Sequence, residues 1–166
     1  MDIRLVISSL AEAETECLAV VLLDHGDKQK PAPRLAMKDA AVEKVLSELI
    51  SSGEISGKAF ETTLLHRPQG LKAKRLLAIG VGKAGSFSHV ELRKAAGTAV
   101  RFLKSRMIKS CAFAIPELST GAEDAVRSIV EGTLVADFDP DTYRSDRKNL
   151  AMKDVTVVAP QGSDQS

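Results

Sequence analysis

The sequence contains few of the side chains from which chemistry is easily recognised. Its 166 residues include no tryptophan, one tyrosine and two cysteines, and aromatic residues make up only 4% of the chain. This scarcity excludes a platform of stacked aromatic side chains, which proteins that bind single-stranded nucleic acid use. Cys17 and Cys111 lie far apart, each within an apolar run, so they predict reduced, buried thiols and no disulfide framework.

Charge of one sign and long apolar runs are also missing. Lys and Arg together number 23, and Asp and Glu 22, so no net charge attracts nucleic acid or an acidic membrane surface. No apolar run approaches the roughly 18 residues of a membrane span, and the N-terminal residues lack the pattern of a signal peptide. These features predict one soluble, cytoplasmic domain that does not contact a membrane.

The stretch Arg75–Arg106 organises the rest of the chain. Residues 76–81 are almost wholly apolar, which is typical of a strand covered on both faces. Ser88 and Glu91 have the spacing of a capping box, so a helix is predicted to start after Ser88. The apolar face of that helix consists of Leu92, Ala96, Ala99 and Leu103. The pattern predicts a strand, a glycine turn and a helix that lies on a sheet.

Strands and helices alternate through much of the sequence. Further strands are predicted at residues 3–8, 18–23, 60–66, 110–115 and 154–159. The first of these alternates apolar and polar residues, which places it at or near an edge, whereas the wholly apolar second one is predicted to be central. The alternation predicts an α/β fold, with a mixed, mostly parallel sheet of about six strands between helices as a three-layer α/β/α sandwich.

Two more helices complete this prediction. Asp39 is expected to cap a helix that ends at Gly53, and Thr120 with Glu123 is expected to form a second capping box. The inward face of the last helix is predicted to hold Ala122, Val126, Ile129, Val130 and Leu134.

The polar segment 24–34, which contains two prolines, is predicted to be a surface loop.

The glycines Gly80, Gly82 and Gly85 spell G-x-G-x-x-G directly after a predicted strand. In a dinucleotide-binding turn the helix begins within the motif, so that its N–H groups reach the pyrophosphate. Here the capping box at Ser88 delays the helix, and no strand ends in an acidic residue about 20 positions later. A structural turn is therefore favoured over a nucleotide site, which stays as the alternative.

Motifs for metals and phosphates are incomplete. The stretch GEISGK at residues 53–58 has three residues between its glycines where a phosphate loop needs four, and Ala59 follows in place of Ser or Thr. The histidines His25, His66 and His89 stand alone. Asp137, Asp139 and Asp141 lack the glycine and glutamate of a calcium loop, so a solvated helix end is favoured.

Basic residues gather in two places. The first cluster consists of His66, Arg67, Lys72, Lys74 and Arg75, and the second of Arg101, Lys104, Arg106 and Lys109. Either could contact phosphates, and the second is the candidate DNA patch. Solvated faces are nevertheless favoured, because the first cluster has no aromatic companion and the second has only Phe102.

Four segments, taken in order, resemble a known family. They are SGKAFETTLL at 56–65, RLLAIGVGK at 75–83, SHVELRKAAGTAVR at 88–101 and VEGTLVADFDPDTYRS at 130–145. Their order and spacing resemble the N-terminal domain of the leucyl, or cytosol, aminopeptidases. The family's Glu-Gly helix and the aromatic, acidic and Tyr-Lys features after it are matched by Glu131, Gly132, Phe138, Asp141, Tyr143 and Arg144.

The resemblance implies a macro-domain-like fold over residues 1–160, followed by a polar tail or the start of a linker at 161–166. It implies that the chemistry belongs to a larger C-terminal domain with two divalent metal ions, zinc or manganese, which polarise the scissile carbonyl and activate water. No catalytic or metal-binding residue carries over, so this chain alone is predicted to be inactive. It further implies a homo-hexamer with the N-terminal domain on the outside and, in some bacterial members, DNA binding. The alternative is a stand-alone macro-like module that binds ADP-ribose or a related nucleotide at Gly80, Gly82 and Gly85.

Overall fold

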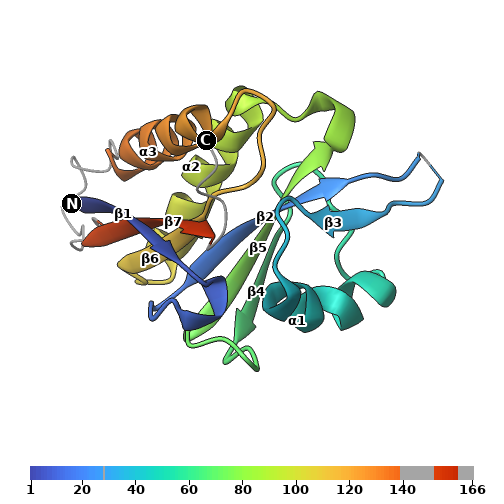
Figure 1. The fold of residues 1–166 in the computed structure, drawn as a ribbon, viewed down its shortest axis with the longest axis horizontal. Helices are drawn as coiled ribbons and strands as arrows, with labels where there is room; N and C mark the ends of the chain where they lie inside the picture. The colour runs from blue at the N-terminus through green and yellow to red at the C-terminus, as the bar shows by residue number, and fades with distance from the viewer. Residues whose placement is uncertain (28, 139–151, 161–166) are drawn as a thin grey trace.

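Seven strands form one mixed sheet in the computed structural model, which describes residues 1–27, 29–138 and 152–160 (Figure 1). The strands are β1 (Asp2–Ser8), β2 (Leu18–Asp24), β3 (Pro33–Leu35), β4 (Thr62–His66), β5 (Arg75–Lys83), β6 (Ser110–Ala114) and β7 (Asp154–Pro160). Their order is β1-β7-β6-β2-β5-β4, with β3 paired to β2 off this path. β3 runs antiparallel to β2, and β4 runs antiparallel to β5. All other neighbouring strands are parallel.

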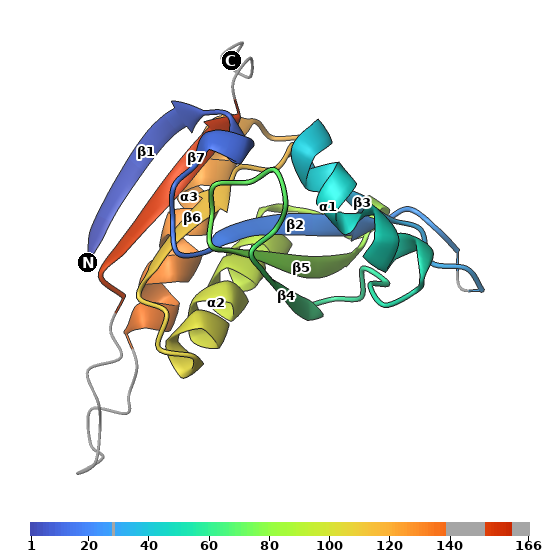
Figure 2. The ribbon, with the colours of Figure 1, turned by 90° about the horizontal axis from the view of Figure 1, so that it is seen from below.

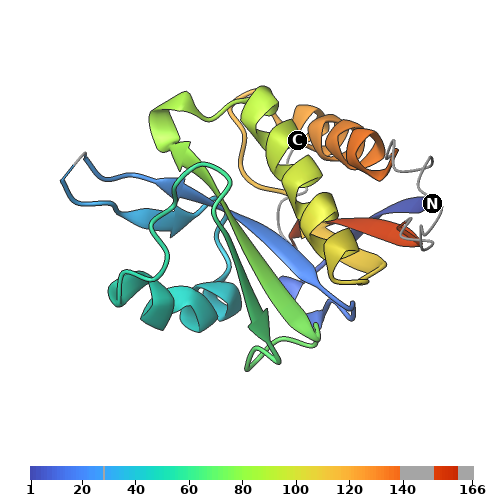
Figure 3. The same cartoon turned by 180° about the vertical axis from the view of Figure 1, so that it is seen from behind.

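Helices cover both faces of the sheet, so the predicted α/β/α architecture is confirmed. The helices are α1 (Ala40–Ser51), α2 (His89–Ser105) and α3 (Ala122–Asp137). The view from below shows α2 and α3 on one face and α1 on the other (Figure 2), and the view from behind shows α2 and α3 side by side (Figure 3). Short 3-10 turns occur at Leu10–Glu12 and Ala84–Ser86. The predicted edge position of the first strand and the central position of the second are also confirmed.

Local sequence signals position α1 and α2 as predicted. The carboxylate of Asp39 accepts a hydrogen bond from the Val42 N–H at 3.0 Å, and Gly53 follows α1 with φ +82°. The Ser88 hydroxyl accepts from the Val90 N–H at 3.2 Å and donates to Glu91 Oε1 at 2.6 Å. All four residues of the predicted apolar face of α2 are buried. These caps satisfy N–H groups that a helix start otherwise leaves without a partner.

The segment predicted as the loop 24–34 is partly a strand, so the sheet has seven strands instead of about six. β3 pairs antiparallel with β2, with Pro33 opposite Asp24 and Leu35 opposite Leu22. The chain reverses because Asp24 accepts hydrogen bonds from both ends of the intervening loop, at the Gly26 and Ala32 N–H groups. A strand of three residues carries too little apolar periodicity to be recognised in the sequence.

Helix α3 departs from the prediction at its start and in its buried face. Its N-cap is Gly121, at φ +105°, and no side chain caps it, so the capping box expected from Thr120 is wrong. The buried residues are Ala125, Ser128, Ile129, Gly132, Thr133 and Ala136. Ala122 and Leu134, predicted to face inward, are exposed. Small residues face inward because α3 packs closely on α2, where a side chain at Gly132 would start 2.1 Å from the Arg93 carbonyl oxygen.

The predicted strand at 60–66 also begins later, at Thr62, because Phe60 has φ +63°. Several residues of the sequence predictions lie outside the described residues: Asp139, Asp141, Tyr143, Arg144 and the tail 161–166.

Candidate functional site

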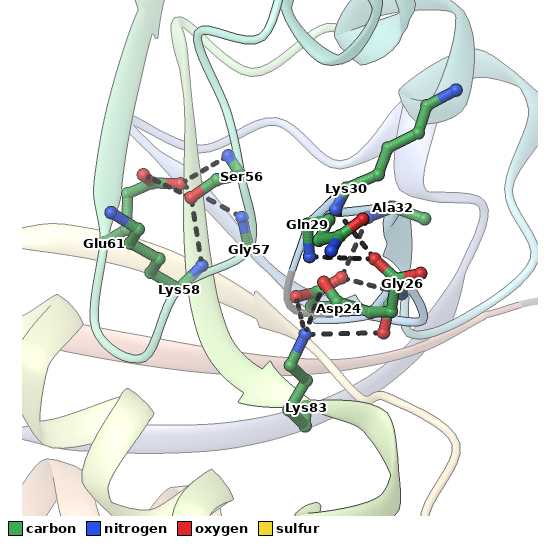
Figure 4. Close-up of polar contacts among 11 residues, drawn as sticks. Asp24, Gly26, Gln29, Lys30, Ala32, Ser56, Gly57, Lys58, Glu61 and Lys83 are labelled. Atoms are coloured by element: carbon green, nitrogen blue, oxygen red, sulfur yellow. Dashed lines mark hydrogen bonds and ion pairs between the residues drawn. The ribbon is translucent and has the colours of Figure 1, made fainter.

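The carboxyl ends of β2 and β5 meet at one edge of the sheet, the edge at which open α/β sheets bind ligands. Asp24 ends β2, Lys83 ends β5, and the two are register partners. The Lys83 ammonium lies 2.8 Å from Asp24 Oδ2 (Figure 4). The sequence motifs do not include this pair: a polar residue at the end of each apolar run is its only signal, and that signal does not show that β2 and β5 are neighbours.

The Asp24 carboxylate has partners on both oxygens. Oδ1 accepts from the Gly26 and Ala32 N–H groups, each at 2.8 Å, while Oδ2 binds Lys83. The hydrogen bond from Lys83, followed by those from Ala32 and Gly26, lowers the pKa of Asp24 to about 2. Because the carboxylate is ionised and already accepts three hydrogen bonds, it is poorly suited to act as a general acid or base near neutral pH.

Lys83 ties the β2–β3 connection to the end of β5. Its ammonium also donates to the carbonyl oxygens of Gly26 at 3.4 Å and Asp27 at 3.3 Å. The Asp27 carboxylate in turn accepts from the Gln29 and Lys30 N–H groups, and these bonds, Lys30 first, lower its pKa. The result is a hairpin with a hydrogen-bonded tip, which projects from the sheet at the right of Figure 1.

A second set of polar contacts holds the loop before β4 (Figure 4). Glu61 Oε1 accepts from the N–H groups of Ser56 at 2.9 Å and Gly57 at 3.2 Å, and Glu61 Oε2 accepts from the Ser56 hydroxyl at 3.0 Å. Ser56 and Gly57, which belong to the stretch that resembles a phosphate loop, therefore form a turn around the Glu61 carboxylate. This turn packs against β5.

The structure places the three motif glycines in different elements. Gly80 and Gly82 lie within β5, which extends beyond the predicted residues 76–81, and only Gly85 lies in the turn after it, so the prediction that the motif directly follows the strand is wrong. The Gly80 N–H donates to the Glu61 carbonyl at 2.8 Å, and the Gly82 N–H to the Gly57 carbonyl at 2.9 Å. A Cβ at Gly80 would lie 2.2 Å from the Lys58 carbonyl oxygen, so glycine is required there by chain packing.

The candidate DNA patch lacks one of its four predicted members at the surface. Lys104 is buried, and its ammonium donates to the Asp137 carbonyl at 3.1 Å and lies 3.6 Å from Asp137 Oδ1. The Arg106 guanidinium lies over the Phe102 ring, 4.1 Å from its centroid. Periodicity could not reveal the burial of Lys104, because the acceptor comes from the end of a different helix.

The other predicted polar residues have structural partners or stand apart. Asp137, the described member of the acidic trio, accepts from the Met152 N–H at 2.8 Å and so joins α3 to the start of β7. In the first basic cluster, Lys72 pairs with Glu12 at 2.6 Å, and Arg75 donates to the Glu16 carbonyl at 3.3 Å. His25, His66 and His89 are exposed. Within the described ranges, no three His, Cys, Asp or Glu residues form a group that could hold a metal ion.

Both cysteines are buried and unbonded to one another. Burial raises the pKa of the Cys17 thiol to about 12 and also raises that of Cys111. Neutral thiols of this kind are poor nucleophiles.

A groove of about 930 Å³ crosses the face of β1, β7 and β6 that lies on the α1 side of the sheet. It is lined by Arg4, Lys72 and Lys74 as well as by Glu12, Glu14, Glu16 and Asp154. Because both signs of charge are present, the groove favours no class of ionic ligand.

No helix in the described part of the chain is long and apolar enough to cross a bilayer.

Comparison with known proteins identifies similar sequences. Residues 20–147 match the model of the N-terminal domain of the cytosol aminopeptidase family. The chain is 43% identical to a probable cytosol aminopeptidase of Koribacter versatilis over 96% of its length, and 40% identical to one of Acidobacterium capsulatum over 99%. In both cases it spans 34% of the relative, about a third of that protein.

Solved structures show the same fold at low sequence identity. A mutant of tomato leucine aminopeptidase aligns with a TM-score of 0.69 at 18% identity, over 95% of this chain and 32% of that one. The macrodomain of Thermus aquaticus DarG aligns with a TM-score of 0.58 at 13% identity, over 96% of this chain and 97% of that one. The second alignment confirms the predicted macro-domain-like architecture.

Proposed function

Because the chain belongs to the cytosol aminopeptidase family, in which it is the N-terminal domain, we propose that it is the non-catalytic part of a metalloaminopeptidase. In this proposal the complete enzyme removes N-terminal amino acids from peptides in the cytoplasm. Two divalent metal ions, zinc or manganese, serve the reaction and are bound outside this chain. The chain itself supplies neither a catalytic nor a metal-binding residue.

The observation that carries the proposal is the position of the match. The family model for the N-terminal domain covers residues 20–147, and the chain spans about a third of the length of its relatives. The polar residues at the carboxyl edge of the sheet support a structural role, because Asp24 and Lys83 already bind one another and the hairpin backbone.

We further propose that the domain acts by assembly, through contact with its own catalytic domain and within a homo-hexamer. The hairpin formed by residues 24–27 and 29–33 is suited to such contacts, because hydrogen bonds hold these residues before any partner arrives. The candidate patch gives less support to a role in DNA binding than its sequence suggests, since Lys104 is buried.

The test uses three proteins: this chain alone, the Koribacter versatilis relative without its matching third, and a fusion in which this chain replaces that third. We expect the fusion to assemble and to hydrolyse a leucine p-nitroanilide with added manganese or zinc. The truncated relative should assemble poorly, and this chain alone should be inactive. Light scattering after gel filtration gives the assembly state, and absorbance gives the rate.

Two outcomes contradict the proposal. Metal-dependent hydrolysis by this chain alone would show that it holds catalytic residues. A folded fusion that assembles no better than the truncated relative would exclude the assembly role. Titration of the chain with ADP-ribose in a calorimeter tests the alternative nucleotide function, for which we expect no heat of binding.

A further inference from the structure

The structure brings together basic residues that the sequence places in two separate clusters. His66 and Arg75 belong to the first cluster and Arg106 to the second, yet all three line one cleft of about 460 Å³. This cleft lies where the end of β4, the start of β5 and the end of α2 meet. No acidic side chain of the described residues lines it, and its other lining residues are Thr62, Leu64, Phe102 and Ile108.

The pairing of β4 with β5 explains why two of the basic residues share the cleft. His66 and Arg75 are register partners in this antiparallel pair, so their side chains lie on the same face of the sheet. That face is the one beneath α2, because Leu64 and Leu77, the register partners two residues further along, pack in the core on that side. Arg106 directly follows α2 and reaches the same corner.

The two guanidinium groups are positioned by contacts that leave their charge uncompensated. Arg75 is half-buried and donates one N–H to the Glu16 carbonyl oxygen at 3.3 Å. The Arg106 guanidinium lies over the Phe102 ring, and a contact of this kind uses none of its five N–H groups. Among the described residues, no carboxylate forms an ion pair with either guanidinium group.

The C-terminal end of α2 opposes an anion less than a bare helix end would. The last carbonyl groups of a helix carry partial negative charge when they lack a hydrogen-bond donor. Here the Leu103 carbonyl accepts from the N–H groups of Arg106 at 3.1 Å and Ile108 at 2.9 Å. The Phe102 carbonyl accepts from the Ser105 hydroxyl at 2.6 Å. The two guanidinium groups therefore dominate the charge of the cleft.

We propose that this cleft binds the phosphate group of a small molecule. Arg75 and Arg106 supply charged donors, and a guanidinium group can donate two parallel N–H bonds to one phosphate. The His66 imidazole and the Thr62 hydroxyl can each donate a further hydrogen bond. An anion between the two guanidinium groups also offsets their mutual repulsion. The proposal concerns a ligand of this domain and does not depend on peptidase activity.

A small molecule suits the cleft better than a nucleic-acid backbone. Duplex DNA carries one negative charge per about 1.7 Å of its axis, and proteins that bind it neutralise several phosphates along a surface. Here the guanidinium groups converge on one cleft, and Lys104, the buried member of the candidate DNA patch, cannot extend the surface. The cleft volume lies within the range of small-molecule sites, about 300–1,000 Å³.

A titration of this chain with inorganic phosphate, followed by two-dimensional NMR at pH 7 and constant ionic strength, tests the proposal. We expect saturable shifts at the residues that line the cleft, including the guanidinium N–H signals of Arg75 and Arg106. The dissociation constant should be on the order of 1 mM. Arg106→Gln, at an exposed position, and Arg75→Gln should each raise it about tenfold, because a charged hydrogen-bond donor is lost. Circular dichroism checks folding, and Arg106→Gln decides the test if Arg75→Gln does not fold.

The matched control is Arg101→Gln, which removes the same charge from another exposed position of α2 that does not line the cleft. It should leave the dissociation constant unchanged. Glycerol phosphate distinguishes two sources of the phosphate group. Equal affinity for the two compounds identifies free phosphate as the ligand, whereas tighter binding of glycerol phosphate identifies a phosphate ester.

Three outcomes overturn the proposal. The first is the absence of saturable shifts at the cleft, and the second is an equal loss of phosphate binding in Arg101→Gln and Arg106→Gln, which would show attraction by general surface charge. The third is a duplex DNA that binds more tightly than either phosphate compound and depends equally on both arginines. That result would assign the cleft to a nucleic-acid surface.

Discussion

Asp24 shows how a single residue can determine the course of the chain around it. Its carboxylate joins the end of β2 to two N–H groups of the following loop and to Lys83 at the end of β5. The loop closes into a hairpin, and β3 becomes part of the sheet. The residue most suggestive of acid–base chemistry at the carboxyl edge therefore has a structural role.

Replacement of this carboxylate should reduce stability in a pH-dependent way. The folded pKa of Asp24, about 2, lies below the usual value of an aspartate, so its contribution is present above pH 4 and is lost as the pH falls toward 2. Asp24→Asn should lower the free energy of unfolding by about 1–2 kcal/mol at pH 7, because Lys83 is half exposed and screened by water. Urea denaturation at pH 7, 4 and 2.5 measures the difference.

The exposed Glu54→Gln change is the control and should leave the unfolding curves unchanged. The difference between Asp24→Asn and wild type should shrink as the pH approaches 2.5. If it stays constant with pH, ionisation of Asp24 does not stabilise the fold.

The pairing of α2 with α3 depends on the absence of a side chain at one position. A Cβ at Gly132 would lie 2.1 Å from the Arg93 carbonyl and 3.1 Å from the Ala96 side chain. The small residues of α3 thus allow close helix packing, and the larger ones, Leu134 and Val135, are turned outward. Lys104 and Asp137 join the ends of the two helices on the buried side.

Gly132→Ala should destabilise the protein although alanine favours helices, because the contact is with backbone that cannot move without separating α2 from α3. Overpacking of this kind costs about 1–3 kcal/mol. Gly85→Ala is the matched control: nothing lies within 4 Å of its Cβ position, and its φ is not positive. Thermal denaturation should show a lower melting temperature for Gly132→Ala alone. Equal effects would contradict tight packing at the helix crossing.

At the scale of the whole molecule, two core clusters share the central strands. Adjacent residues of β2 and β5 face opposite sides of the sheet. Val20 therefore belongs to the cluster beneath α1, and Val21 belongs to the cluster beneath α2. Neither layer can lose its packing without exposing strands that the other needs. The domain is therefore expected to unfold as one unit.

Thiol reactivity tests this expectation. Cys17 and Cys111 are buried with raised pKa values, so both should resist a disulfide reagent at pH 8 in the native state. In urea both should become reactive together, with the same midpoint as the loss of the circular dichroism signal. Because both thiols lie in the cluster beneath α2 and α3, a thiol midpoint that differs from the circular dichroism midpoint would show that this layer unfolds separately.

The sequence by itself determined the elements whose signals are local. The apolar runs at 18–23 and 76–81 predicted buried parallel strands, and the side chains of Asp39 and Ser88 predicted two helix starts, because hydrophobic periodicity and capping act over a few neighbouring residues. The order of family segments also identified the domain before its geometry was known.

Only the tertiary structure decided what depends on partners far away in the chain. Sequence order does not reveal that Lys83 pairs with Asp24 or that Lys104 is buried against Asp137. Nor does it reveal that the Lys58 carbonyl packs against Gly80, where a side chain would not fit.

The inward face predicted for α3 is correct for Ile129, which is buried, and for Val126 and Val130, which pack against the core, but wrong for Ala122 and Leu134, which are exposed. The alternation within β1 predicted a position at or near an edge, but only the strand order shows which strand it pairs with, because the residues of a strand do not specify its neighbours.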